Sequence, residues 1–340
     1  MRLPRLTGAP ACAIAVPVRN EAAHLPLLLR ALARQCEAPT FGVALFFDSC
    51  TDDSHAVVRE IAPTLRYRIE IGCSAGIAPP NAGRARAAAG ALALSLAPDV
   101  ILSTDADSEP AVDWVAANCA ALEGADLVAG KIVIASAAAG SLHERLAAYY
   151  DRLHRYRRRI DPVAWEDDAT HHWTSATSLA VRADAYRSLD GFLPLSRGED
   201  ADFADRAWRE GYRLRRDARV VVRTSGRRQG RAEGGFATML ADHDAGRVAT
   251  TVSHPEDEAW RYDRHAQARA SFAVGEFQLL ADLLGLSRCD VERSADQARN
   301  ADAFAACIVG APPGGMRQIS LAHAEIVLTA LDADMLEGAA

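Results

Sequence analysis

The sequence between Ala11 and about Val222 alternates short apolar runs, which are typical of strands, with longer segments of helical periodicity. The apolar runs are almost entirely hydrophobic, as expected of strands that are covered on both faces. Strand and helix in alternation predict an α/β fold with a mostly parallel sheet and helices on both sides. The predicted strands are Ala11–Val18, Val43–Phe47, Tyr67–Ile71, Asp99–Ser103 and Leu127–Ile134, and the predicted helices between them are Glu21–Cys36, Asp52–Ile61, Asn81–Ala97 and Pro110–Leu122.

The pattern changes after residue 235, where long helical stretches replace the alternation. Helices are predicted at Ala259–Leu284 and Ile319–Leu336, with a loop rich in proline and glycine at Ala311–Gly315 between them. A length of 340 residues fits two domains, or one large α/β domain with an appendage. We therefore expect an α/β domain over residues 1–235 and a mainly helical region over residues 236–340.

Composition and charge exclude several classes of protein. Lys and Arg number 38 against 45 Asp and Glu, giving a net charge of −7, which argues against a nucleic-acid partner. Hydrophobic residues make up 49% of the chain, enough for a substantial core. The seven cysteines contain no Cys-x-x-Cys pair and indicate free thiols in a reducing compartment. No apolar run is long enough for a transmembrane segment, so we expect a cytoplasmic protein, with peripheral membrane association left open.

Polar residues directly follow the first two predicted strands. Ligands of parallel sheets bind at the carboxyl ends of the strands, which makes the segment Pro17–Glu21 and the residue Asp48 candidates for a binding site. Each segment taken alone also fits an ordinary capping turn. Asn20 would then cap the first helix, and Thr51 or Asp52 would start the second.

Asp105 and Asp107 come directly after the predicted strand Asp99–Ser103. Two carboxylates one residue apart repel each other unless a cation or another partner compensates them. Hard divalent cations prefer oxygen ligands of this kind, so Mg²⁺ or Mn²⁺ joining these aspartates to a diphosphate is the expected use. Asp-x-Asp occurs by chance in many proteins, and the position after a buried strand is what favours a metal site here.

Two later segments carry further polar residues. The stretch Trp173–Arg182 reads WTSATSLAVR and precedes a short helix and Gly191-Phe192. Farther along, Glu199 and Asp200 open a helix that is predicted to end near Gly211. An acidic pair at this place is suited to capping the helix as well as to chemistry.

Taken together, these segments resemble glycosyltransferase family 2, the inverting nucleotide-sugar glycosyltransferases of the GT-A fold. The resemblance covers roughly residues 11–235 and rests on VPVRNE, DSCTDD, TDAD, LAVR with a following DGF, and GED with Arg206 downstream, in the family's order. It implies transfer of a sugar from a UDP- or GDP-sugar donor to a hydroxyl acceptor of unknown identity, with Mg²⁺ or Mn²⁺ as cofactor. Residues 236–340 lie outside the resemblance and would shape the acceptor side or form a homodimer interface.

The resemblance also assigns roles to individual residues on the donor side. Asp107 would ligate the divalent cation, with Asp105 assisting. The segment Asn81–Arg86 matches the stretch ahead of the family's third helix, whose basic side chain approaches the nucleotide, although a solvated arginine face is equally open there. The residues assigned to the nucleotide are Pro17, Arg19, Glu21, Asp48, Arg84 and Asp105, and those assigned to the diphosphate are Arg227, Arg228 and Arg231.

On the acceptor side, Asp200 matches the acid that acts as general base in the family's inverting enzymes, and Glu199 is its neighbour. His172 and Trp173 fall where the family's acceptor pocket begins. The vicinal histidines His171 and His172 are also compatible with ordinary packing.

One departure from the family pattern leaves alternatives open. The family's second strand usually ends in two adjacent acids, whereas Phe47 precedes Asp48 here, so the choice between uridine and guanosine stays undecided. Phe47 also keeps open a catalytically silent nucleotide-sugar binding or regulatory protein. A nucleotidyltransferase or a dehydrogenase is disfavoured because no glycine-rich loop follows the first strand.

Overall fold

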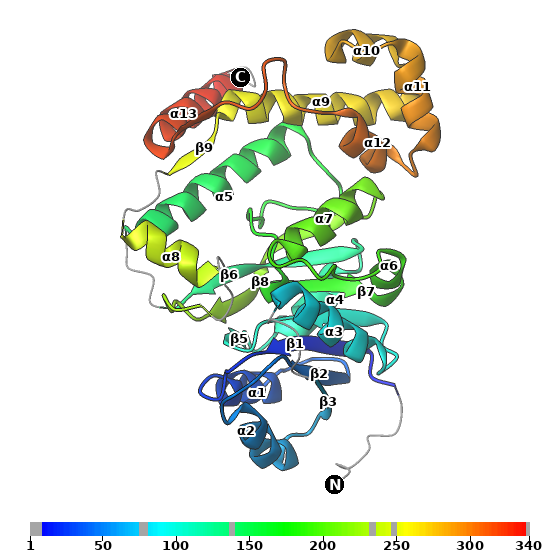
Figure 1. The fold of residues 1–340 in the computed structure, drawn as a ribbon. Helices are drawn as coiled ribbons and strands as arrows, with labels where there is room; N and C mark the ends of the chain where they lie inside the picture. The colour runs from blue at the N-terminus through cyan, green and yellow to red at the C-terminus, as the bar shows by residue number, and fades with distance from the viewer. Residues whose placement is uncertain (1–8, 75–80, 136–139, 231–235, 246–249, 338–340) are drawn as a thin grey trace. The chain divides into compact units, whose positions relative to one another are not determined.

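The computed structural model describes residues 9–74, 81–135, 140–230, 236–245 and 250–337 (Figure 1). The chain divides into two compact units. One unit comprises Met1–Ala137, Trp173–Asp205 and Leu214–Ala241, and the other comprises Ala138–His172, Arg206–Arg213 and Asp242–Ala340. The second unit therefore takes two segments from the middle of the chain in addition to the C-terminal helices.

The first unit is organised around an 8-stranded sheet with the order β3-β2-β1-β4-β7-β6-β8-β5. Strands β3, β2, β1 and β4 run parallel to one another, as do β6 and β8. Strand β7 is antiparallel to β4 and β6, and β5 is antiparallel to β8. The predicted α/β class with a mostly parallel sheet is confirmed. The strands are β1 Cys12–Val18, β2 Phe41–Phe47, β3 Arg68–Cys73, β4 Val100–Ser103, β5 Ser108–Pro110, β6 Leu127–Ile134, β7 Leu179–Arg182 and β8 Leu214–Thr224.

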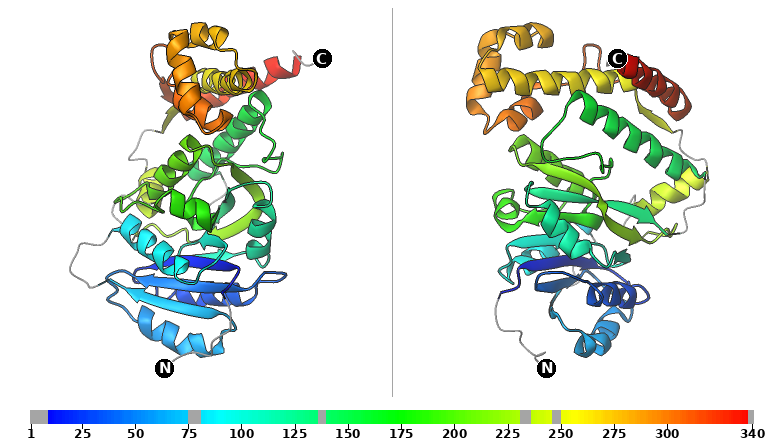
Figure 2. Two further views of the ribbon diagram at one scale, coloured as in Figure 1. Left: turned by 90° about the vertical axis from the view of Figure 1, so that its right-hand side faces the viewer. Right: turned by 180° about the vertical axis from the view of Figure 1, so that it is seen from behind.

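Helices cover both faces of the parallel part of the sheet, with α1 and α2 on one side and α3 on the other (Figures 1 and 2). The chain adds β2 and β3 on one side of β1 and then β4 on the other side. Because crossovers between parallel strands are right-handed, this change of side places α3 on the opposite face of the sheet from α1 and α2. The helices that begin in this unit are α1 Leu25–Ala33, α2 Ser54–Ile61, η1 Ala62–Thr64, α3 Ala82–Leu94, α4 Trp114–Ala121, η2 Ala176–Ser178, α6 Ala183–Ser188, α7 Glu199–Arg209 and α8 Phe236–Asp244.

The alternation of side chains along β1 explains how both faces are packed. Ile14 and Val16 belong to the core cluster that includes the leucines of α1. The residue between them, Ala15, faces the other way and is also fully buried. Helix α3 packs on β1 and β2, and its buried positions include the small residues Ala89 and Ala93, while Gly90 lies against Tyr186 of α6. The alanine-rich composition of this helix therefore has a packing role.

The second unit is mainly helical, as expected for residues 236–340. The predicted helix Ala259–Leu284 forms as two helices, because Gly275 adopts a φ of 73° and ends the first of them. In the described part of the chain, no helix combines the length and apolar character needed to cross a membrane. The elements of the second unit are α5 Leu142–Ile160, β9 Thr251–Ser253, α9 Pro255–Val274, α10 Gln278–Leu284, α11 Arg288–Gln297, α12 Ala301–Ile308, β10 Gln318–Ser320 and α13 Leu321–Glu337.

Truncation before Phe236 is expected to destabilise what remains of the chain, because α5 would lose its packing partners. Tyr149 and Leu153 of α5 form one core cluster with Tyr262, Leu321 and other residues beyond the truncation point. Each large apolar side chain returned to water costs about 1.5–3 kcal/mol. Thermal unfolding and solubility of residues 1–235 measure the effect. A truncated chain as soluble and as stable as the full chain would contradict this prediction.

Candidate functional site

A cavity of about 560 Å³ lies at the carboxyl ends of the parallel strands of the first unit. Residues that directly follow β1, β2 and β4 line it, together with residues 173–175, residues 196–200 and the segment after β8. Strands β1 and β4 are neighbours at the point where the strand order reverses, which is where ligands bind in sheets of this kind. The fold therefore brings the separate polar motifs of the sequence to one cavity.

The turns after β1 and β2 are tied to each other. Asn20 has a φ of 53°, and its Oδ1 accepts hydrogen bonds from the backbone N–H groups of Thr51 at 2.8 Å and Asp52 at 3.3 Å. Ser54 Oγ accepts a hydrogen bond from the backbone N–H of Glu21 at 2.9 Å. Asn20 therefore does not cap the first helix, whose N-cap is His24, but joins two loops of the cavity wall. Pro17, Arg19 and Glu21 line the cavity.

Asp48 lines the cavity beside these turns and is only 2% exposed. Ser49 Oγ donates to its Oδ1 at 3.3 Å, and the backbone N–H of Asn81 donates to its Oδ2 at 3.4 Å. The preceding Phe47 is buried in the core and stacks on His55 with ring centroids 3.9 Å apart. Phe47 thus belongs to the hydrophobic core, and Asp48, which directly follows β2, is the acidic side chain that lines the cavity at this point.

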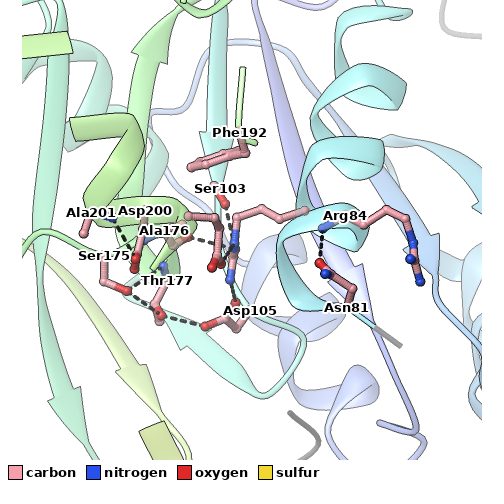
Figure 3. A network of polar contacts seen from close by, with 12 residues as sticks. Asn81, Arg84, Ser103, Asp105, Ser175, Ala176, Thr177, Phe192, Asp200 and Ala201 are labelled. Atoms are coloured by element: carbon pink, nitrogen blue, oxygen red, sulfur yellow. Dashed lines mark hydrogen bonds and ion pairs between the residues drawn. The ribbon is translucent and has the colours of Figure 1, made fainter. Parts of the chain in front are cut away.

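Two arginines of α3 have different positions. Arg84 is not among the residues that line the cavity; its backbone N–H donates to Asn81 Oδ1 at 2.8 Å, and its guanidinium lies 4.0 Å from Asp48 Oδ1. Figure 3 shows the Arg84 side chain pointing away from Asp105. Arg86, by contrast, lines the cavity and is 8% exposed.

Arg86 joins the end of β4 and the turn after it to the start of α7. Its Nη2 donates to Asp105 Oδ1 at 2.8 Å, its Nε donates to Glu199 Oε1 at 3.0 Å, and its Nη1 donates to Ser103 Oγ at 3.1 Å. The ring centroid of Phe192 lies 5.9 Å from Cζ of the Arg86 guanidinium. Burial by itself would lower the pKa of Arg86, but the charges of Asp105 and Glu199 outweigh burial and raise it above its usual value. Arg86 is therefore a permanent cation that connects the Asp-x-Asp turn to the start of α7.

The two aspartates after β4 are in different electrostatic environments. Both oxygens of Asp105 are engaged, Oδ1 with Arg86 and Oδ2 with the Thr177 hydroxyl, which donates at 2.6 Å (Figure 3). Burial would raise the pKa of Asp105, but Arg86 and Thr177 hold it below its usual value. Burial and the negative charge of Asp105 raise the pKa of Asp107 to about 6. Asp107, which pairs with Arg227, is thus the carboxylate of the two whose negative charge burial and Asp105 disfavour.

Asp200 lines the same cavity from the first turn of α7. Its Oδ1 accepts a hydrogen bond from the backbone N–H of Ala201 at 2.9 Å, and its Oδ2 accepts one from that of Ala176 at 3.4 Å (Figure 3). Both donors are neutral, whereas the neighbouring Glu199 is buried and paired with the Arg86 guanidinium. The acidic pair therefore divides into a carboxylate committed to an ion pair and a carboxylate available in the cavity.

The predicted diphosphate-binding arginines after β8 are only partly brought to the cavity. Arg227 lines it and pairs with Glu21 and Asp107. Arg228 is exposed, is not among the lining residues, and donates to the backbone carbonyl of Gly226. Arg231 lies outside the described residues.

The predicted acceptor residues His172 and Trp173 fall into different units. Trp173 lines the cavity, where its indole could contact a sugar ring. His172 is bound within the second unit: its Nδ1 lies 2.6 Å from Asp151 Oδ1, and its ring packs against Tyr150. The structure thus brings only Trp173 to the site.

Arg86 is a site residue that the sequence pattern did not single out from its neighbour Arg84. The buried positions of α3 include Gly83, Arg86, Gly90 and Ala93, which follow a helical repeat that excludes Arg84. An arginine on a buried face of a helix requires buried carboxylates as partners. By contrast, the hydrogen bond from Thr177 to Asp105 joins residues 72 positions apart, and no local pattern signals it.

The chain is similar to known proteins in sequence and in fold. Residues 13–180 match the sequence model of the family described as Glycosyl transferase family 2. S. aureus TarS, residues 1–349 in complex with UDP-GlcNAc, is similar in structure with a TM-score of 0.52 and 15% identity, over 87% of this chain and 90% of that one. A mannosyltransferase, PcManGT from Pyrobaculum calidifontis in complex with GDP-Man and Mn²⁺, is similar in structure with a TM-score of 0.50 and 18% identity, over 89% of this chain and 87% of that one. None of the curated proteins matches the chain in sequence.

The residues matched by the family model include the cavity-lining turns after β1, β2 and β4, with Asp48, Asp105 and Asp107. The structural similarity extends over most of the chain and concerns the fold. Through residues 13–180 the chain therefore belongs to glycosyl transferase family 2, as a glycosyltransferase with the GT-A fold.

Proposed function

We propose that this protein transfers a sugar, with inversion, from a nucleoside diphosphate sugar to a hydroxyl group of an acceptor. The observation that carries the proposal is the convergence of Asp48, Asp107 and Asp200 on one cavity from three distant segments of the chain. The volume of about 560 Å³ is in the range of cavities that hold small-molecule ligands. Two proteins that share the fold have solved structures with nucleotide sugars: TarS is in complex with UDP-GlcNAc, and PcManGT is in complex with GDP-Man and Mn²⁺.

On the donor side, we assign the nucleoside to the wall formed by the turns after β1 and β2. Asp48 is buried there and presents acceptor oxygens, which suits the N–H donors of a base or the hydroxyls of a ribose. Arg19 and Pro17 contribute to the same wall. Uridine and guanosine both remain candidates, because a single acidic side chain can accept a hydrogen bond from either base.

The carboxylates in the turn after β4 are suited to a divalent cation, which Asp107 would ligate. Its carboxylate is largely buried, and burial together with Asp105 disfavours its negative charge in the absence of a cation. Asp105 is already bound to Arg86 and Thr177, so we assign ligation to Asp107 and a supporting role to Asp105. Among the described residues, no group of three or more His, Cys, Asp or Glu side chains could hold a metal. Donor phosphates and water would supply the other ligands, as is common for Mg²⁺. A bound cation would supply charge neutralisation of the leaving diphosphate.

On the acceptor side, we assign the general base to Asp200. The carboxylate lines the cavity and has only neutral hydrogen-bond donors in the described structure, so it can accept a proton from the acceptor hydroxyl as the hydroxyl attacks the sugar. One displacement of this kind inverts the anomeric carbon. Trp173, in the same cavity, would hold the acceptor or the transferred sugar through its indole ring.

Nucleotide binding tests the donor assignment directly. We expect either the uridine or the guanosine series, among UDP, UDP-GlcNAc, GDP and GDP-Man, to stabilise the protein against heat in the presence of Mn²⁺. A ligand at 100 times its dissociation constant adds about 2.7 kcal/mol to the free energy of unfolding. The stabilisation should fall when a chelator replaces Mn²⁺. Absence of stabilisation by all four compounds would contradict the proposal, and binding without donor turnover would favour a catalytically silent binder.

A further inference from the structure

Arg227 holds two carboxylates that come from different loops of the cavity. Its Nη1 lies 2.6 Å from Glu21 Oε1 and donates to Glu21 Oε2 at 2.9 Å, while its Nη2 lies 3.2 Å from Asp107 Oδ2. The side chains of Glu21 and Asp107 are 5% and 13% exposed, and that of Arg227 is 24% exposed. His24 Nδ1 also lies 2.9 Å from Glu21 Oε2, and Arg227 is the guanidinium that the two buried carboxylates share.

The position of Arg227 conflicts with that of a divalent cation on Asp107. Nη2 of Arg227 faces Oδ2 of Asp107, which is one of the two atoms through which Asp107 would ligate a cation. A guanidinium and a divalent cation placed against the same carboxylate repel each other strongly where water is scarce. Cation binding therefore requires Arg227 to move or to share its charge with a new anion.

The surroundings of Arg227 leave space for such a movement. Arg227 and Asp107 line the main cavity and also a second cavity of about 310 Å³, which His24, Glu109 and Arg223 line as well. The guanidinium therefore lies in a wall that is common to two cavities. It follows the end of β8, on a segment whose next residue, Arg228, is exposed.

We propose that Arg227 is an exchangeable counter-cation, which neutralises Glu21 and Asp107 until a donor binds and then moves its charge to the donor diphosphate. This inference rests on the proposed function. A diphosphate offers the guanidinium a bidentate partner at the moment when the divalent cation takes its place on Asp107. Cation and nucleoside diphosphate then strengthen each other's binding, and part of that coupling passes through Arg227.

The proposal predicts opposite effects of one substitution on two ligands. In Arg227→Met, Mn²⁺ alone should bind on the order of 10-fold more tightly than in the parent, because its competitor for Asp107 is gone. UDP or GDP, whichever the parent binds, should bind on the order of 10-fold more weakly at saturating Mn²⁺, because the guanidinium contact is lost. Arg227→Lys, which keeps the charge, should return Mn²⁺ affinity toward the parent value.

The matched control is Arg223→Met, which removes an equal charge from the second cavity, where no hydrogen bond or ion pair of the described structure connects it to Asp107. Titration calorimetry with MnCl₂ and then with the nucleotide gives both affinities, and thermal unfolding confirms that each variant is folded. Arg227→Gln provides a second neutral variant. Unchanged or weaker Mn²⁺ binding in folded Arg227→Met and Arg227→Gln overturns the proposal, as does equal tightening in the control. Absence of nucleotide binding in the parent contradicts the proposed function instead, while the Mn²⁺ titration still reports on the ion pair.

Discussion

Asp200→Asn is expected to keep the affinity for the donor while turnover falls by about 10²–10⁴-fold, the usual contribution of a general base. The substituted side chain keeps its shape and one acceptor oxygen, which retains the 2.9 Å hydrogen bond from the N–H of Ala201. The longer hydrogen bond from the N–H of Ala176, at 3.4 Å, goes to the other oxygen and is lost, but the start of α7 should remain in place. An amide cannot take a proton at neutral pH. Turnover is measured as a single-turnover release of UDP or GDP from the donor, with water or an identified acceptor as nucleophile.

Two comparisons make this test specific. Asp202→Asn introduces the same change in the same first turn of α7, at a position that does not line the cavity, and should leave turnover within a fewfold of the parent. Glu199→Gln should lower turnover less than Asp200→Asn but reduce thermal stability, because Glu199 neutralises the buried Arg86. If Asp200→Asn turned over donor nearly as fast as the parent, Asp200 would be excluded as base; loss of donor binding would indicate a structural role at the helix start.

Asp107→Ala should remove the Mn²⁺-dependent part of nucleoside diphosphate binding. A divalent cation contributes several kcal/mol of charge stabilisation, so a loss on the order of 100-fold or more in affinity is expected. Calorimetric titration of UDP or GDP, with Mn²⁺ and with chelator, measures it in the parent and the variant. Glu109→Ala removes a carboxylate that does not line the main cavity and serves as control. Equal affinities with and without chelator in both proteins would show that the metal assignment is wrong.

The pH dependence of Mn²⁺ binding follows from the same residue. Burial and the charge of Asp105 raise the pKa of Asp107 to about 6, and only the ionised carboxylate binds a cation well. Mn²⁺ affinity should therefore fall as the pH drops through about 6, and this fall should be absent in Asp107→Ala. Binding that is constant between pH 7 and pH 5 in the parent would argue against ligation by Asp107.

The sequence by itself determined the fold class, the strands of the parallel half of the sheet, and the loops in which the cavity residues occur. Each predicted strand agrees with the structure to within two residues. The buried strands β1 and β2 are almost continuously apolar because both of their faces are covered, whereas the edge strand β3 alternates in polarity and is only partly buried. The helix starts were predicted less well. Helix α4 begins at Trp114 and not at Pro110, since Ser108–Pro110 pairs as β5 with β8, more than 100 residues farther along the chain. No periodicity within a short segment encodes such a pairing.

Only the tertiary structure decided which of the candidate side chains meet. Arg84 and Arg86 are two residues apart in one helix, and the direction of each side chain relative to the sheet places Arg86 between Asp105 and Glu199 and leaves Arg84 outside the cavity. Asp105 and Asp107 look alike in the sequence, but contacts with Arg86 and Thr177 stabilise the charge of one, and burial disfavours the charge of the other. Apolar periodicity is a local property that a sequence displays directly, whereas the electrostatic environment of a carboxylate depends on residues that the fold alone brings near it.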